Sequence, residues 1–231
     1  MEKTDYLALL RGINVGGNNL IKMDELKNIF IGMSFTDVKT YIQSGNVLFM
    51  DHEKNKFKLV KKIEKTIFDK LNMKINVLTL TFNEIKNILN NIPEGFGKEN
   101  EKFKYDIVFL IEPLLTKNVM KEMQAKKGED QIFEGEKVLY IKRLSHFQNS
   151  VSFGNGFRKT VQMASFSVKS RVDFPKTEVL ENPRLIEKLT GSYLSGIMKT
   201  PMWQNITIRN LNTARKLYEL MLERNTRIKQ A

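Results

Sequence analysis

Residues 6–19 of the chain read YLALLRGINVGGNN, and residues 40–49 read TYIQSGNVLF. The first stretch opens with an apolar run that predicts a strand buried on both faces. This strand ends in the polar residues Arg11, Gly12 and Asn14. The second stretch predicts two short strands joined by a tight turn of sequence SGN.

The pattern of the first 80 residues is typical of a split βαβ unit. Apolar residues recur at helical spacing after each of two strand predictions. The expected elements are strand, helix, strand, strand, helix and strand over residues 5–13, 23–33, 38–42, 46–50, 53–71 and 75–80. In the second helix the predicted apolar stripe is Phe57, Val60, Ile63, Ile67 and Leu71. This order is that of a ferredoxin-like domain.

A similar order follows a predicted helix over 82–91 and the sequence PEGFG at 93–97. The first expected elements are a strand over 103–111, a helix over 115–126 and a hairpin over 131–134 and 137–142. A helix is then expected from Asn182-Pro183 toward Gly191, with a second piece that reaches Lys199. The last elements are a strand over 204–208 and a helix over 213–228 capped by Asn212. The fold class is therefore α+β, with two tandem ferredoxin-like (split βαβ) halves, antiparallel sheets and flanking helices. The expected division is residues 1–92, a linker at 93–102, and residues 103–231.

Composition indicates a soluble protein. The chain has 231 residues, of which 41% are hydrophobic and 28% charged. It has no cysteine, so disulfides, zinc–thiolate sites and cysteine nucleophiles are excluded. The N-terminal residues do not resemble a signal peptide, and no apolar run reaches the roughly 18 residues of a membrane span. We expect a cytoplasmic location and no membrane contact.

The chain is basic, with 38 Lys and Arg against 26 Asp and Glu and a formal net charge of +12. Such an excess favours phosphates, nucleic acid or acidic surfaces. A basic, phenylalanine-rich insertion is predicted at about 147–176, with Asp173 its one acidic residue. It could hold a nucleic-acid backbone and stack bases. The interpretation we favour is a long surface insertion whose phenylalanines fold back onto the core.

Strand order brings the two opening stretches together. In a sheet of order 4-1-3-2, the end of strand 1 lies beside the start of strand 3, so Arg11 and Asn14 should meet Gln43 and Asn46. Arginine can pair with a carboxylate or phosphate, and the amides can recognise donors and acceptors of a ligand. The alternative is structural, because Asn and Gly are common in turns and Arg11 could cover a helix end.

The chain resembles the domain of unknown function 1697 family, a mainly bacterial set, near both of its ends. Near the N-terminus the resemblance is in RGINVGGNN, Met23 and TYIQSGNVLF. Near the C-terminus it is in Thr207-Ile208-Arg209-Asn210, Thr213, Lys216 and Leu217. The resemblance implies the paired α+β fold and carries no settled activity. It adds weight to a ligand-binding role for a set of motif residues: Arg11, Gly12, Asn14, Gly16, Gly17, Tyr41, Gln43, Ser44, Gly45, Asn46, Arg209 and Asn210. Family members have a short Gly-rich basic segment after the second hairpin, for which residues 154–160 or residues 191–193 are the candidate counterparts here.

No established catalytic or cofactor motif is present. His52 and His146 are the only histidines, so no metal site is predicted. Ser44 is not in a GxSxG context, nucleotide-binding fingerprints are missing, and strand 46–50 lacks the aromatic signature of RNA-binding modules. No cofactor is indicated.

Three functions therefore stand. The first is capture of a small anionic ligand or nucleotide at the Arg11/Gln43–Asn46 edge. The second is an enzyme of unassigned type that uses the same residues, with Ser44 or Tyr41 as the reactive group. The third, which we disfavour, is nucleic-acid binding through the insertion.

Overall fold

A computed structural model describes residues 3–15, 19–123, 130–145, 194 and 196–230 of the protein. Within these residues it has eight strands and five α-helices. The first half contains β1 (Thr4–Leu10), α1 (Met23–Gly32), β2 (Thr36–Tyr41), β3 (Asn46–Asp51), α2 (Lys56–Leu71), β4 (Val77–Thr81) and α3 (Phe82–Asn90). The second contains β5 (Phe103–Leu110), α4 (Thr116–Glu122), β6 (Asp130–Glu134), β7 (Val138–Leu144), the 3-10 turns η4 (Ile197–Lys199) and η5 (Pro201–Asn205), β8 (Ile206–Asn210) and α8 (Leu211–Gln230).

The strands form two four-stranded antiparallel sheets, and the architecture is α+β. The first sheet has the order β2-β3-β1-β4, which is the order predicted from the sequence. The second has the order β6-β7-β5-β8, so corresponding strands occupy corresponding places in both sheets. In each sheet the first strand of the half is central.

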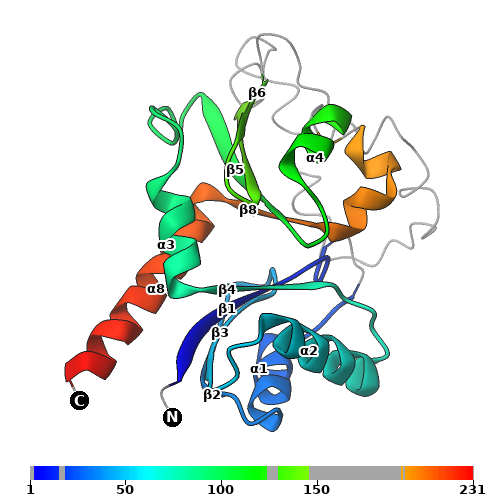
Figure 1. Ribbon diagram of the computed structural model, residues 1–231, viewed down its shortest axis with the longest axis vertical. Helices are drawn as coiled ribbons and strands as arrows, with labels where there is room; N and C mark the ends of the chain where they lie inside the picture. The colour runs from blue at the N-terminus through cyan, green and yellow to red at the C-terminus, as the bar shows by residue number, and fades with distance from the viewer. Residues whose placement is uncertain (1–2, 16–18, 124–129, 146–193, 195, 231) are drawn as a thin grey trace, which may run out of the picture.

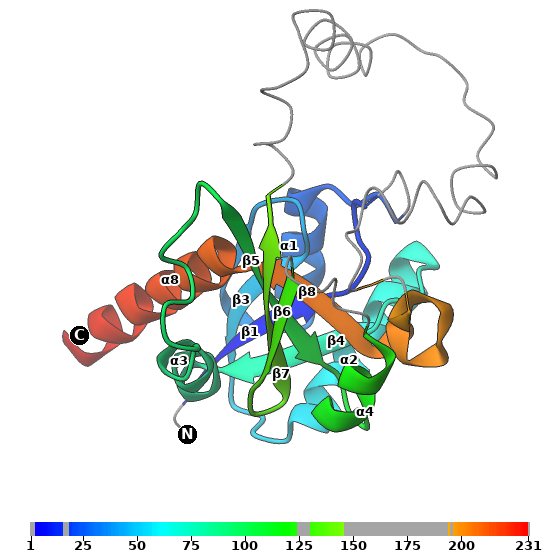
Figure 2. The same ribbon diagram turned by 90° about the horizontal axis from the view of Figure 1, so that it is seen from above.

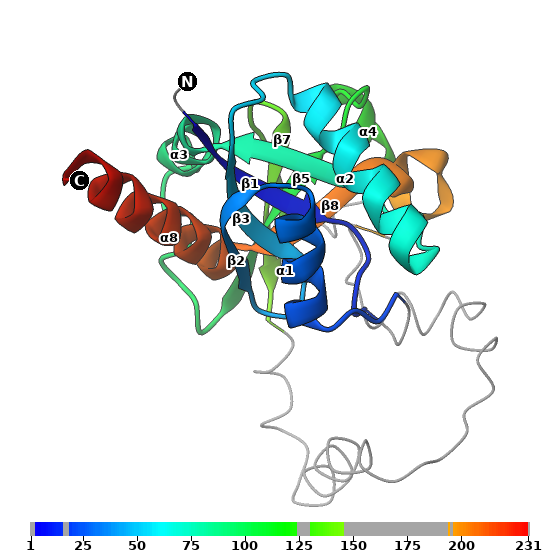
Figure 3. The ribbon, with the colours of Figure 1, turned by 90° about the horizontal axis from the view of Figure 1, so that it is seen from below.

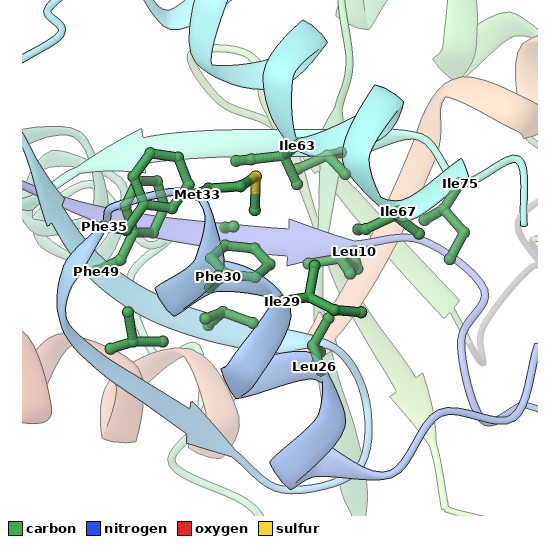
Figure 4. Packing of buried hydrophobic residues seen from close by; sticks show 14 of the residues in the cluster. Leu10, Leu26, Ile29, Phe30, Met33, Phe35, Phe49, Ile63, Ile67 and Ile75 are labelled. Atoms are coloured by element: carbon green, nitrogen blue, oxygen red, sulfur yellow. The ribbon is translucent and has the colours of Figure 1, made fainter. Parts of the chain in front are cut away.

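Helices α1 and α2 cover the outer face of the first sheet (Figure 3). Leu59, Ile63 and Ile67 recur every four residues along α2 and are buried there. Figure 4 shows Ile63 and Ile67 packed with residues of α1, β1 and β3. The sequence places Phe57 in this stripe, which is wrong: Phe57 is 70% exposed, because it lies on another side of the helix from Leu59.

The inner face of the first sheet packs against the second sheet (Figure 1). On β1, Leu7 and Leu9 belong to this shared core, together with Ile107 and Phe109 of β5. Seen from above, the strands of the two sheets run across one another (Figure 2). The apolar character of both faces of β1 therefore has its explanation in the fold, because one face meets α1 and α2 and the other meets the second half.

The outer face of the second sheet is covered by α4 and the turn η4. Val108 of β5, Val119 of α4 and Ile197 of η4 are fully buried in this cluster. The molecule is thus layered as helices, sheet, sheet and helices. At one side, α8 packs along α3, with the rings of Phe82 and Tyr218 stacked at 5.4 Å (Figure 1).

Two boundaries near the C-terminus differ from the sequence prediction. Residues Pro201–Asn205 form a 3-10 turn, so the last strand begins at Ile206. Helix α8 begins at Leu211, and the Asn210 side chain caps it by accepting a hydrogen bond from the Thr213 amide (2.7 Å). The predicted cap at Asn212 is therefore wrong, because the strand runs two residues further than its apolar pattern indicates. The predicted helix start at Asn182-Pro183 lies outside the described residues.

Candidate functional site

The end of β1 and the β2–β3 turn lie side by side at one edge of the first sheet. Leu9 pairs with Asn46 in the register of β1 and β3, and the Leu10 amide donates to the Gly45 carbonyl oxygen (2.8 Å). Gly45 has a φ of +75°, and a Cβ atom there would lie 2.8 Å from the Ile13 side chain. The turn therefore requires glycine at this position.

Arg209 reaches this edge from β8 of the second half. The residue is only 8% exposed. Its Nε donates to Asn46 Oδ1 (2.6 Å), and its Nη2 donates to the carbonyl oxygens of Leu10 (3.0 Å) and Ser44 (2.8 Å). These three bonds join the two halves through buried polar atoms.

Nη1 of Arg209 donates within its own strand, to Thr207 Oγ1 (3.0 Å) and the Ile208 carbonyl oxygen (2.7 Å). A guanidinium has five N–H donors, and all five are used in these contacts and the three to the first half. Burial lowers the pKa of Arg209 to about 10, so the group stays charged at neutral pH. Arg209 therefore acts in this structure as a fully satisfied link between the halves.

Asn46 is fully buried and uses its side-chain amide in the same network. Its Nδ2 donates to the Tyr41 carbonyl oxygen (3.0 Å) and to Ser44 Oγ (2.9 Å), while its Oδ1 accepts from Arg209. The side chain thus closes the β2–β3 turn and presents it to the second half. Of the predicted residues, Tyr41, Ser44, Asn46 and Arg209 are brought together in one cluster.

Arg11 also faces the second half, but its donors are only partly used. Its Nε donates to the carbonyl oxygens of Trp203 and Ile206, both at 3.1 Å. Its Cζ lies 5.3 Å from the centre of the Trp203 ring, within the range of a cation–π contact. Nη1 and Nη2 have no hydrogen-bond partner in the described part of the chain. Burial lowers the pKa of the Arg11 guanidinium below its usual value.

Asn14 organises the loop that follows β1. It has a φ of 54°, and its side chain accepts from the Ile21 amide (2.8 Å) and donates to the carbonyl oxygens of Ile21 (3.0 Å) and Gln43 (2.9 Å). A surface hollow of about 400 Å³ is lined by Asn14, Lys22 and Gln43 among others. The hollow therefore lies at the edge where the sequence predicts a ligand.

The remaining predicted residues have separate places. Gly12 is exposed with a φ of +68°, and its carbonyl oxygen accepts from Asn19 Nδ2 (3.2 Å). Asn210 caps α8, as described above. Gly16 and Gly17 lie outside the described residues, as does the predicted insertion at 147–176.

A second polar link, which the sequence patterns did not predict, joins α8 to β1. Arg224 Nη1 lies 2.7 Å from Asp5 Oδ1, and its Nε lies 2.7 Å from Asp37 Oδ2. Asn225 Nδ2 also donates to Asp5 (3.1 Å). Burial raises the pKa of Asp5 to about 6, against the opposing effect of Arg224. Asp5 stands in an otherwise apolar strand, and that anomaly is the signal that could have revealed this link.

Trp203 was also missed, although it is the single tryptophan of the chain. Its side chain is half-buried and lies against Arg11. No spacing in the sequence connects residue 203 to residue 11. Only the packing of the two halves brings them together.

These features define an α+β protein of two packed antiparallel sheets whose halves are joined by buried arginines. The chain belongs to the family described as protein of unknown function (DUF1697), which matches residues 3–140. None of the curated proteins matches the chain.

A solved structure is similar over almost the whole length. It is that of the conserved bacterial protein SP0830 from Streptococcus pneumoniae, with 22% identity and a TM-score of 0.64. The match covers 94% of this chain and 98% of that one. At this identity the similarity supports the fold alone. In the described part of the chain, no helix is both long and apolar enough to span a membrane.

Proposed function

We propose that this is a cytoplasmic ligand-binding protein that captures a small anionic ligand or nucleotide where the RGIN strand end meets the QSGN hairpin. The observation that carries the proposal is the geometry of Arg11. The Arg11 guanidinium is held by two contacts: its Nε donates to two carbonyl oxygens, and its Cζ lies near the ring of Trp203. Nη1 and Nη2 remain without a partner among the described residues. Because the guanidinium is already held in place, it loses little conformational entropy when Nη1 and Nη2 bind an anion.

The hollow at the same sheet edge supports the same class of ligand, and Arg11 itself is not one of its lining residues. Gln43 is exposed, and together with Asn14 and Lys22 it lines the hollow at this edge. Lys22 and Glu25 give the hollow one positive and one negative charge, so the attraction of anions comes from the net charge of +12, which acts over longer distances. Gln43 and Lys22 are the polar groups that would orient a ligand there, whereas the Asn14 side chain holds the loop in place.

Arg209 and Asn46 have a positioning role in this proposal. Their hydrogen bonds are made to protein atoms, and they hold the end of β1 against the hairpin turn. A binding group functions best on a rigid support, because its geometry is then set before the ligand arrives. Asn210 contributes through the cap of α8, and Gly12 through its left-handed backbone.

We also propose that each half is a ferredoxin-like unit, with residues 1–92 and 103–231 joined by a linker at 93–102. The repeated strand order supports this division. Phe96 of the linker segment is buried in the core shared by the two sheets, so the segment is packed against both units.

The proposal can be tested through Trp203, which is the only tryptophan and lies against Arg11. We expect inorganic phosphate or AMP to change the tryptophan emission in a saturable way and to raise the melting temperature. Arg11→Ala should abolish both effects. Arg227→Ala is the matched control, because it removes the same charge from an exposed position on α8.

Lys22→Ala provides a variant that does not threaten the fold, because Lys22 is exposed. It should weaken binding severalfold at unchanged stability. Equal phosphate and AMP affinities in wild type, Arg11→Ala and Lys22→Ala would rule out this site. A lack of any saturable response to either probe in the wild-type protein would rule out the proposed ligand class.

A further inference from the structure

A second cavity, which Arg11 does not line, lies between the two halves. It has a volume of about 320 Å³, within the range of small-molecule sites. Val60 of α2, Thr79 of β4 and Ile88 of α3 line it from the first half. Phe109 of β5 and Val138 of β7 line it from the second. The cavity therefore exists only because the halves are packed together.

The free edge of β4 runs along this cavity. β4 is the last strand of its sheet, and it pairs only with β1 among the described strands. The Arg11 amide donates to the Asn76 carbonyl oxygen (3.0 Å), so Asn76 directs its main chain toward β1. In an antiparallel pair this orientation alternates along the strand. The amides and carbonyls of Val77, Thr79 and Thr81 therefore point toward the free edge.

Two of these three amides are capped by carboxylates. The Val77 amide donates to Glu64 Oε1 (3.1 Å), and the Thr81 amide donates to Glu84 Oε2 (2.8 Å). Carboxylates in these positions prevent another strand from pairing along the edge. The amide and carbonyl of Thr79, between them, have no partner in the part of the chain that the structure describes. One main-chain donor and one acceptor thus lie beside the cavity without a partner among the described residues.

The Thr79 side chain adds a third unsatisfied group. The residue is 2% exposed, and its Oγ1 has no hydrogen-bond partner among the described residues. A buried hydroxyl without a partner destabilises a fold, whereas a valine of the same shape would not. Such an exception is explained if the hydroxyl has a partner that is not part of the protein.

The charged groups around the cavity balance one another. Lys56 pairs with Glu84, and Lys137 pairs with Glu112 (3.0 Å). The charged residues that line the cavity are three lysines and three glutamates: Lys56, Lys61, Lys137, Glu64, Glu84 and Glu112. In a chain with a net charge of +12, this neutral lining does not select an anion.

We propose that this cavity is a binding site for a small uncharged molecule that has an apolar body and one amide-like pair of donor and acceptor. The pair would bond the Thr79 main chain as one residue of a neighbouring strand does. The Thr79 hydroxyl would bond the same polar group, and the apolar body would pack on Phe57, Val60 and Leu78, the apolar lining residues that keep exposed surface. The two capped amides limit the contact to a single residue, so the ligand is a small molecule and not an added protein strand.

The test uses the full chain and N-acetyl-L-leucine methylamide, which offers one extended residue with a carbonyl and an amide on each side. In ¹H–¹⁵N correlation spectra, we expect the Thr79 amide to shift and saturate with added probe. N-acetyl-L-leucine, with a free carboxylate, should bind more weakly. Lys22→Ala, at an exposed position outside this cavity, should leave probe affinity unchanged, so this site and the site at the RGIN edge can fail independently.

Thr79→Val separates a ligand-binding hydroxyl from a structural one. We expect this variant to melt at a higher temperature without ligand and to bind the probe about tenfold more weakly, the equivalent of one lost hydrogen bond. Thr36→Val, on the opposite edge strand β2, is the matched control and should not change probe affinity. Val60→Trp, at a half-buried position on the wall, should abolish binding by filling the space.

Three results would overturn the inference. The first is a Thr79 amide that does not shift with the probe. The second is a Thr79→Val variant that is less stable than the wild type or binds the probe equally well. The third is a capped pentapeptide that binds far more tightly than the single residue, because this would show strand addition and not a small-molecule site.

Discussion

Arg209 and Asn46 are 163 positions apart in the sequence, and the 2.6 Å hydrogen bond between Arg209 Nε and Asn46 Oδ1 joins the two halves of the molecule. Around it, Nη2 of Arg209 satisfies the carbonyl oxygens of Leu10 and Ser44. Main-chain groups at a strand end and a tight turn lack sheet partners, and buried groups of this kind require hydrogen bonds. The motif residues of the first half thus supply hydrogen-bond acceptors for one side chain of the second half.

Arg209→Met should lower the free energy of unfolding by about 3 kcal/mol or more, because several buried acceptors lose their donor at once. The free energy of unfolding of Arg209→Lys should lie between those of Arg209→Met and the wild type, because lysine keeps the positive charge but lacks the several N–H donors of the guanidinium. Urea denaturation followed by Trp203 fluorescence measures both. Arg227→Met, at an exposed position, is the control. A change of less than about 0.5 kcal/mol for Arg209→Met would contradict the role given to this residue.

Asn46→Ala and Arg209→Met should be strongly non-additive. Residues in one hydrogen-bond network have coupling energies of about 0.5–3 kcal/mol in double-mutant cycles. The control cycle pairs Asn46→Ala with Arg224→Met, which removes the separate link to Asp5 and Asp37. We expect additivity in the control. Equal coupling in both cycles would mean that the mutations act through general loosening of the fold.

The Asp5 carboxyl should titrate near pH 6 in the folded protein, because burial raises its pKa above the unfolded value of 3.8. The folded state then binds the proton more tightly than the unfolded state. The contribution of Asp5 to stability should rise as the pH falls through the interval between these two values and be constant outside it. The measurement is the difference in unfolding free energy between wild type and Asp5→Asn from pH 4 to pH 7. A difference that is flat over this range would contradict the raised pKa.

Thr81→Ala should destabilise α3 by about 1 kcal/mol, the usual effect of losing an N-cap. Thr81 Oγ1 accepts from the Glu84 amide (3.3 Å), and Glu84 Oε2 accepts from the Thr81 amide (2.8 Å), which completes a capping box. Urea denaturation measures the loss. Thr81→Ser keeps the cap and should be close to wild type, and an equal loss in both variants would show that the methyl group matters and not the cap.

Local patterns predicted most of the secondary structure. Apolar spacing located β1, α1, α2 and the β6–β7 hairpin because the two periods, two and 3.6 residues, are set by backbone geometry. The pattern failed where apolar residues were few. Phe57 is exposed because it lies on another side of α2 from the buried Leu59, and β8 extends beyond its apolar residues because Arg209 and Asn210 end it.

The candidate site was predicted only in part. Strand order alone brings Arg11 near Gln43–Asn46, and that order follows from the succession of elements. The strand order does not reveal which of these side chains has hydrogen-bond donors that stay unused. Arg209 has five donors in use, whereas Arg11 has only its Nε in use among the described residues, and the two arginines look alike in sequence.

The sequence by itself determined the α+β class, the order of strands in the first sheet and the residues that form its turn, because short-range periodicity and turn geometry depend on neighbours along the chain. Tertiary structure alone decided the partners of Arg209 and Arg11. Each of these depends on how one sheet packs across the other, and that packing places residues more than 100 positions apart within hydrogen-bond distance. The cavity beside Thr79 has the same origin, because its walls come from both halves.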